Sequence, residues 1–327
     1  MAWTLAELSK IETDILRKSV IDTMIMESNL MELIPWETIG QLATGVIRIK
    51  DLPSIGFRKI NEGYAEGIGH FEHKVETISL FGHDIDTDIA IARAKNTVAD
   101  ARAIQQTLTL KSVAYAFNDK FINGNPITDP EEFKGLSKRV DDIYNENTTV
   151  FASQYIDLAD TTNYGILRDS AARFAFLDKL NELIYAIKGH NPSFLLMNKK
   201  CLLAVRSLLL REKLLDTTQD MFNRKIDTYL GARMIDIGVK ADQSTEIITN
   251  TQTLGGGSYE TSIYAVSFSV GDMTWGLQQY PLEVRDLGEL ESKPTFRTRV
   301  DWNIGLATVD PRSLARLYGI RADATSS

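Results

Sequence analysis

An alternating segment near the carboxyl end of the chain limits the fold more than any other part of the sequence. From Phe296 to Ile304, charged or amide residues alternate with less polar ones, which is the two-residue period of a half-buried strand. A turn signal follows at Asp310, whose side chain can accept a free backbone N–H at a helix start. Pro311 fits the first helical position because its missing N–H had no partner there. We therefore expect a short closing helix that is capped by Gly319.

The bulk composition is that of an ordinary folded protein. The chain has 327 residues, of which 43% are hydrophobic and 24% are charged, so it can form two domains or one core with large excursions. The single cysteine, Cys201, excludes an internal disulfide framework and is consistent with a reducing cytoplasm. Its side chain is expected to pack as a small apolar group on a helix. The N-terminal segment lacks the features of a signal peptide, so the mature protein is expected to begin near Met1.

The charge distribution argues against a protein that reads nucleic-acid sequence. The net charge is −8, and Lys and Arg are scattered among acidic residues. A duplex-binding surface needs clustered cations that displace counterions from phosphate. No apolar run approaches the roughly 20 residues that a membrane-spanning helix needs.

Two N-terminal segments have more apolar or extended surface than they can bury themselves. Residues 4–33 are predicted to be helical from a Thr4/Glu7 capping box onward, and the helix ends in a dense apolar stretch before Pro35. This helix either folds on its own core or packs as an arm on a neighbouring subunit.

Residues 45–85 are predicted to form two strands joined by a long glycine-rich tip. Because such an extended hairpin is poorly stable alone, another subunit is expected to hold it.

Helices and strands mix in the rest of the chain, which indicates the α+β class. The helix at 169–188 is expected to bury Phe174 and to end at Gly189. The other predicted elements are a long helix at 97–122, a strand at 194–197, a helix from Asn198 to Leu210, and strands at 234–239, 262–270 and 282–285.

Two groups of residues could bind a metal ion. Three of the four histidines lie close together in sequence, at His70, His73 and His83. A three-residue step places the first two on opposite faces of a strand, so packing or solvated histidines are the favoured interpretation. Three carboxylates would share one face of an extended strand, at Asp84, Asp86 and Asp88. A solvated strand edge is favoured over a divalent-ion site there.

No pattern in the sequence indicates catalysis. Gly63–Gly69 lacks the Lys-Ser/Thr of a phosphate-binding loop, and Gly255–Gly257 is interpreted as a turn. The chain has no GxSxG motif, and Cys201 has no evident histidine partner. We therefore assign no catalytic, cofactor-binding or metal-binding residue, and we expect that the protein is not an enzyme.

The order of the predicted parts resembles the major capsid proteins of tailed phages with the Hong Kong 97-type fold. The closing segment VDWNIGLATVDPRSLARLYGI (300–320) is the most specific local match, and FKGL (133–136) resembles the segment after the spine helix of that family. The resemblance implies the following division of the chain: an N-terminal arm at 1–44, an extended E-loop hairpin at 45–86, a peripheral domain with the spine helix at 87–139, an axial domain at 140–280, and C-terminal strands with a final helix at 281–327.

The resemblance also implies the function. It predicts a virion protein that self-assembles in the host cytoplasm, as hexamers and pentamers, into the icosahedral head around a double-stranded DNA genome. The expected partners are other copies of the chain, a separate scaffolding protein and the portal, with a decoration protein as a further candidate. Packaged DNA would be contacted non-specifically. No membrane partner is expected. Because the predicted arm starts almost at Met1, N-terminal cleavage is not expected. Lys59 and Lys74 lie in the presumed E-loop, but the segment around Lys293 offers no evident Asn acceptor, so covalent crosslinking is not implied.

Two other functions stay open at this stage. An encapsulin, which is a cellular compartment that holds an enzyme cargo, would share the fold. A metal-dependent enzyme that uses the histidine cluster is a remote alternative from another class.

Overall fold

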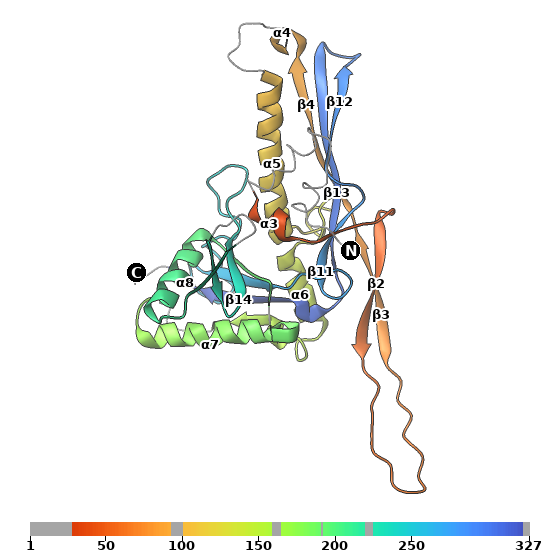
Figure 1. Cartoon of the computed structure of the whole chain (residues 1–327), viewed down its shortest axis with the longest axis vertical. Coiled ribbons are helices and arrows are strands. Elements are labelled where there is room, and N and C mark those ends of the chain that lie inside the picture. Colours follow the sequence, from red (N-terminus) through yellow and green to blue (C-terminus); the bar gives the residue numbers. More distant parts are fainter. Residues whose placement is uncertain (1–27, 93–100, 159–164, 191, 220–224, 323–327) are drawn as a thin grey trace.

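The computed structural model describes residues 28–92, 101–158, 165–190, 192–219 and 225–322. In Figure 1 these residues form a body with a long helix along one side, and a two-stranded hairpin projects from the body. The described strands make one mixed five-stranded sheet, one seven-stranded sheet and the separate hairpin. The predicted helix at 4–33 lies mostly outside the described residues. Helices and strands are mixed along the chain, as the α+β prediction requires.

The five-stranded sheet is built around one long strand, β13 (Thr295–Thr308). β4 (Ser79–Asp88) pairs antiparallel with it from Thr295↔Asp88 to Ile304↔Ser79. β12 (Glu283–Glu289) pairs with the first half of β13, and β11 (Thr274–Gln278) pairs with its second half. β1 (Trp36–Thr38) lies parallel to β11 at the sheet edge.

The long helix α5 (Ala101–Asn123) covers this sheet, with the one-turn α4 (Ile89–Ala92) beyond the end of β4. An aromatic cluster joins the helix to the sheet: the ring centroid of Trp302 lies 5.5 Å from that of Phe117 and 4.9 Å from that of Trp36. All three side chains are almost fully buried. The predicted helix at 97–122 is therefore present from residue 101, and its apolar face builds the main core.

The short helix α3 (Asn29–Leu33) begins at Ser28, whose side chain accepts from the Met31 N–H. Leu30, Met31 and Ile34 are buried in the same core as α5. The apolar stretch before Pro35 therefore packs on the chain's own body in the described part of the chain.

The seven-stranded sheet has the order β5–β14–β10–β6–β9–β8–β7. Its strands are β5 (Tyr155–Asp157), β14 (Leu314–Ile320), β10 (Thr261–Val266), β6 (Phe194–Met197), β9 (Ala232–Asp236), β8 (Lys225–Tyr229) and β7 (Asp216–Gln219). The helices packed with it are α6 (Leu136–Glu146), α7 (Ser170–Ala186) and α8 (Lys199–Arg211). Single 3-10 turns lie at Ala152–Gln154, Lys188–His190 and Pro311–Ser313.

Local capping signals were reliable guides to these helices. The Asp169 side chain accepts from the Ala172 N–H at the start of α7, and Asn198 accepts from the Cys201 N–H at the start of α8. The Cys201 thiol is fully buried, which raises its pKa to about 12 and makes it a packing group. One detail was wrong: Phe174 is 53% exposed because it lies on the solvent side of α7.

The predicted closing helix at the C-terminus is also wrong. Asp310 does accept from the Arg312 N–H, and Pro311 starts a single 3-10 turn. Leu314–Ile320 then continues as strand β14, which lies between β10 and β5. Strand pairing on both edges provides partners for the backbone N–H and C=O groups, which a helix would pair internally. Gly319 has a φ of 74° inside this strand. The final helix of the 281–327 division is therefore replaced by a strand.

Among the described residues, no helix is long and apolar enough to cross a membrane.

Candidate assembly surface

The hairpin consists of β2 (Ala43–Asp51), β3 (His70–Thr77) and the loop between them, and it projects away from the body (Figure 1). It carries large apolar side chains that are between 61% and 109% exposed. These are Ile47, Ile49, Leu52, Ile55, Phe57, Ile60, Tyr64, Ile68, Phe71 and Val75. An exposed apolar surface of this size marks an interaction site in a soluble protein.

The loop itself has few internal contacts to bury these side chains. The Arg58 guanidinium lies over the Tyr64 ring at 5.1 Å and donates to the Glu62 carbonyl at 3.2 Å. The Glu62 N–H donates to the Lys59 carbonyl. These contacts order the tip locally but leave Ile55 and Phe57 almost fully exposed. The apolar tip is therefore available to another molecule.

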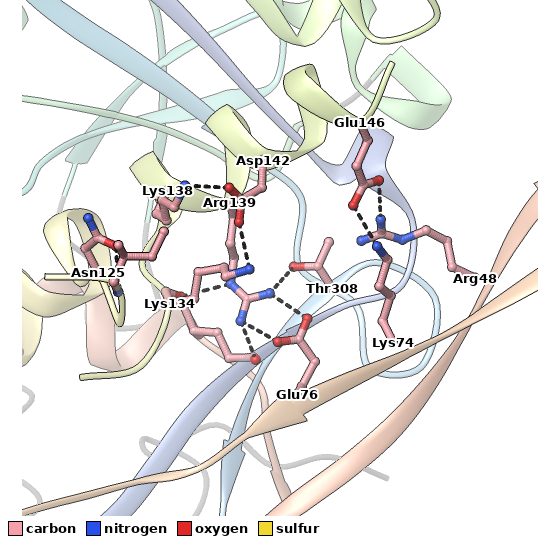
Figure 2. A network of polar contacts seen from close by, with 12 residues as sticks. Arg48, Lys74, Glu76, Asn125, Lys134, Lys138, Arg139, Asp142, Glu146 and Thr308 are labelled. Carbon is pink, nitrogen blue, oxygen red and sulfur yellow. Dashed lines mark hydrogen bonds and ion pairs between the residues drawn. The ribbon is translucent and has the colours of Figure 1, made fainter. Parts of the chain in front are cut away.

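Polar side chains attach the hairpin to α6 and β13; we call Arg48, Lys74, Glu76, Arg139 and Glu146 the hairpin root (Figure 2). Its inner part is Arg139, which is 5% exposed and bonds both oxygens of Glu76 at 2.7 and 2.9 Å. The same guanidinium donates to the carbonyls of Lys134 and Leu306 at 2.9 and 2.6 Å. A planar guanidinium suits such a site because it offers several donors in a fixed geometry.

The outer part of the root is centred on Glu146, the last residue of α6. One carboxylate oxygen accepts from Arg48 of β2 and the other from Lys74 of β3, both at 2.9 Å (Figure 2). The hydrogen bond to Glu146 raises the pKa of Lys74 above its ordinary value, so this ammonium stays charged. Arg48 also donates to the Val309 carbonyl at 3.2 Å. Both strands of the hairpin are therefore bonded to one carboxylate of the body.

Asp142 lies on the same side of α6, between Arg139 and Glu146. Burial alone would raise the pKa of its carboxyl, but the ammonium groups of Lys134 and Lys138, at 2.7 and 2.6 Å, hold it below its usual range. Asp142 is therefore ionised and neutralised within the body.

A small apolar cluster supports the base of the hairpin. Val46 of β2 and Ile78, the residue between β3 and β4, pack with Trp275, Leu277 and Ala307. Gly305 permits this close approach: a Cβ at that position would lie 2.5 Å from the Thr77 carbonyl oxygen. Any other residue at 305 would push the hairpin base away from the sheet.

Two carboxylates of β4, Asp84 and Asp86, are paired with arginines, whereas Asp88 accepts from the Ala90 N–H at 2.8 Å. Asp84 bonds Arg299 at 2.7 and 2.8 Å, and Asp86 bonds Arg297 at 2.7 Å through both of its oxygens. These hydrogen bonds to Arg299 and Arg297 lower the pKa values of the Asp84 and Asp86 carboxyls, respectively. The favoured interpretation of a solvated edge was therefore incomplete, because the acids form a charge ladder across β4 and β13.

The histidines do not converge on one site. His70 begins β3 and lies 3.6 Å from Asp51, His73 lies over Gly45 in the hairpin, and His83 lies in β4 beside α5. Among the residues that the structure describes, no group of three or more His, Cys, Asp or Glu side chains could hold a metal ion.

Sequence reasoning missed the hairpin root. Arg139 and Glu146 of α6 lie 63 and 70 positions after Glu76 of β3, and an arginine or glutamate in an amphipathic helix gives no signal by itself. One clue was available: Arg139 lies at a helical spacing that places it beside Leu136, Val140 and Ile143, on the buried side of α6.

Comparisons with known proteins agree with this architecture. The model of the family described as major capsid protein GP7 matches residues 13–165. No curated protein matches the chain in sequence.

Solved structures share the fold at low sequence identity. The holo-SrpI encapsulin complex from Synechococcus elongatus PCC 7942 matches with a TM-score of 0.63 and 16% identity, over 91% of this chain and 89% of that chain. The capsid of a native GTA particle matches with a TM-score of 0.59 and 13% identity, over 90% of each chain. A structure from Mycobacterium phage Bobi matches with a TM-score of 0.58 and 9% identity, over 89% of each chain.

Proposed function

We propose that this chain is a major capsid protein with the Hong Kong 97-type fold and that its copies assemble as hexamers and pentamers into the icosahedral head of a tailed phage. The protein forms part of the virion and associates with itself. In this proposal the head encloses double-stranded DNA and is assembled in the host cytoplasm, and the chain has no catalytic role.

The observation that carries the proposal is the uncovered apolar hairpin. Ile55, Phe57 and Ile60 are each at least 90% exposed, which is unfavourable for an isolated soluble subunit. In an assembled shell, each hairpin would lie as an E-loop on a neighbouring copy and bury these side chains. Each subunit both gives and receives such contacts, so weak contacts would combine through avidity.

The other parts of the chain then take the roles expected from the family. Residues 1–44 would be the N-terminal arm, 45–86 the E-loop, 87–139 the peripheral domain with α5 as its spine helix, 140–280 the axial domain, and 281–327 the returning strands. The buried positions of Leu30, Met31 and Ile34 support an arm whose base belongs to the body. A separate scaffolding protein, a portal and a decoration protein would be its partners. A net charge of −8 would let packaged DNA slide along the lining without tight binding.

Electron microscopy of purified protein tests the proposal most directly. Uniform hollow shells are expected from the unaltered chain. The double variant Ile55→Ser/Phe57→Ser should give folded subunits that form few or no shells, because it removes apolar surface that only a neighbour can cover. Lys59→Ser/Glu62→Ser changes two polar positions of the same loop and should assemble normally.

Three measurements separate folding from assembly in this test. Circular dichroism checks that each variant is folded, size-exclusion chromatography measures the assembled fraction, and micrographs show particle form. A discrete small oligomer from the unaltered chain would reject the proposal. Normal shells from Ile55→Ser/Phe57→Ser would show that the apolar tip of the hairpin is not needed for assembly.

The fold similarity to the SrpI encapsulin supports a second candidate, the shell of a cellular compartment. The major capsid protein family match favours the phage head over this candidate. The content of native particles separates the two: packaged DNA supports the head, whereas a protein cargo in its place supports the compartment. A terminase and a portal gene next to the gene for this chain would also favour the head.

A further inference from the structure

Glu146 is placed where a helix disfavours a carboxylate. It is the last residue of α6, and no basic residue lies in the last turn of that helix. The free carbonyl groups at a helix C-terminus repel an anion. The charge of Glu146 is therefore compensated by Arg48 and Lys74, which both belong to the projecting hairpin.

Open space lies on both sides of these two ion pairs. A cavity of about 400 Å³ separates the hairpin from α6 and is lined by Arg48, Lys74, Glu76, Arg139 and Glu146. A second cavity, of about 610 Å³, continues past Glu146 towards Lys188 and Arg312. The hairpin is therefore held to α6 by polar contacts between these two cavities and not by close apolar packing. Such contacts can break without opening the core.

The inner root differs from the outer root in burial. The side chains of Arg139 and Glu76 are 5% and 14% exposed, whereas those of Lys74 and Glu146 are 33% and 34% exposed. Arg48, whose side chain is 10% exposed, is the buried member of the outer part. Arg139 also bonds carbonyls of two other segments, and Ile78 anchors the same end of the hairpin in an apolar cluster. Val46, which lies opposite Lys74, packs in the same cluster. The base of the hairpin up to this level is therefore fixed, whereas the Glu146 carboxylate and the Lys74 ammonium are accessible to water and salt.

We infer that Glu146 is a releasable latch that sets the angle of the hairpin to the body. While Glu146 bonds both Arg48 and Lys74, the hairpin keeps the direction shown in Figure 1. When these bonds break, the hairpin swings about its fixed base at Val46, Glu76 and Ile78. The use of this swing, to fit neighbours that meet at different angles, rests on the proposed function, but the swing itself is a property of the single subunit.

Spin-label distance measurements on unassembled subunits test the latch. Cys201 is fully buried, so cysteines introduced by His70→Cys at the start of β3 and Glu182→Cys on α7 can be labelled selectively. The variant Glu146→Gln removes the charge that bonds both hairpin strands. It should broaden and shift the distribution of distances between the two labels.

Glu72→Gln is the matched control. Glu72 contacts the same Lys74 ammonium at 3.1 Å, but it lies within the hairpin and does not bond it to α6. Its label distances should equal those of the unaltered chain. Both variants should unfold within about 3 °C of the unaltered subunit, because partly exposed ion pairs contribute little to stability.

Salt gives an independent measurement without mutation. Raising the ionic strength from about 0.1 M to about 1 M shortens the screening length from about 10 Å to about 3 Å. It should reproduce the broadening in the unaltered chain and change Glu146→Gln little. Unchanged distances in Glu146→Gln, or no response of the unaltered chain to salt, would overturn the latch.

The outcome for the latch is separate from that for the proposed function. Broadened distances in a protein that forms no shells would support the latch and reject the capsid role. Normal shells together with unchanged label distances would reject the latch and support the capsid role.

Discussion

Arg139 and Glu76, which are 63 residues apart, form a nearly buried ion pair with two hydrogen bonds of 2.7 and 2.9 Å between α6 and the end of β3. This pair connects the projecting hairpin to the buried side of α6. The same arginine therefore stabilises the body, through its bond to the Leu306 carbonyl, and fixes the position of the hairpin, through its bonds to Glu76.

Arg139→Met should strongly destabilise the subunit. The substitution leaves the Glu76 carboxylate and the Leu306 carbonyl without their donor in a nearly buried place, which costs about 3–5 kcal/mol in free energy of unfolding. Urea denaturation of unassembled subunits would show a lower midpoint. Arg285→Met is the control, because the Arg285–Asp301 pair is 49% and 26% exposed and should contribute less than about 1 kcal/mol. Equal midpoints for the two variants would contradict the structural role of Arg139.

Acid should weaken the charge ladder between β4 and β13. The folded-state pKa values of Asp84 and Asp86 are lowered by Arg299 and Arg297, so these groups stabilise the fold above their unfolded pKa of about 3.9. That contribution is lost as pH falls through the lowered folded-state values. Asp84→Asn/Asp86→Asn should therefore be less stable than the unaltered chain at pH 7.

The pH dependence of this stability difference is the measurement that checks the ladder. Thermal unfolding should give a constant difference between the double variant and the unaltered chain above about pH 5, a shrinking one below about pH 4, and none in stronger acid. A difference that is independent of pH would show that the asparagines act through packing and not through charge.

Leu317→Asp should prevent folding. Leu317 is fully buried in β14 within the seven-stranded sheet, where a charge has no partner, so the expected cost is about 4 kcal/mol or more. The same change at Leu287, which is 45% exposed in β12, is the control and should leave the subunit folded. Soluble expression and circular dichroism distinguish the two. A folded Leu317→Asp subunit would mean that this strand is not part of the core.

Gly305→Ala should loosen the base of the hairpin. The added Cβ would meet the Thr77 backbone oxygen at 2.5 Å, and backbone cannot move aside as a side chain can, so a loss of about 1–3 kcal/mol is expected. Gly40→Ala, where the added carbon meets nothing within 4 Å, is the matched control. Chemical denaturation measures both. Equal stability of the two variants would argue that β13 does not press on the hairpin base.

Elements with complete local signals could be predicted from the sequence. Asp169 and Asn198 cap their helices as expected, and the residues at 194–197 form a buried strand. The hairpin was also predictable, because two strand-like segments flank a glycine-rich loop that can form no compact element. In each case the deciding interactions lie within a few residues or across one turn.

The end of the chain shows where local reasoning failed. Leu314, Leu317 and Tyr318 have helical spacing, and Asp310 and Pro311 form a good helix start. Side chains on both faces of β14 are buried, so β14 lacks the alternation that identifies a half-buried strand. Arg316 illustrates this: it is 4% exposed, bonds Ser262 and lies over the Tyr264 ring, partners that local sequence does not indicate.

By itself, the sequence determined the mixed class, the long helix, the projecting hairpin and the absence of a recognisable catalytic motif, because propensity, capping and hydrophobic period act over short stretches of chain. Only the tertiary structure decided that β14 is a strand, that Asp84 and Asp86 face arginines, and that Arg139 and Glu146 hold the hairpin. Those outcomes depend on the register between segments that are distant in sequence. Burial and charge compensation fix that register only when the whole chain is packed.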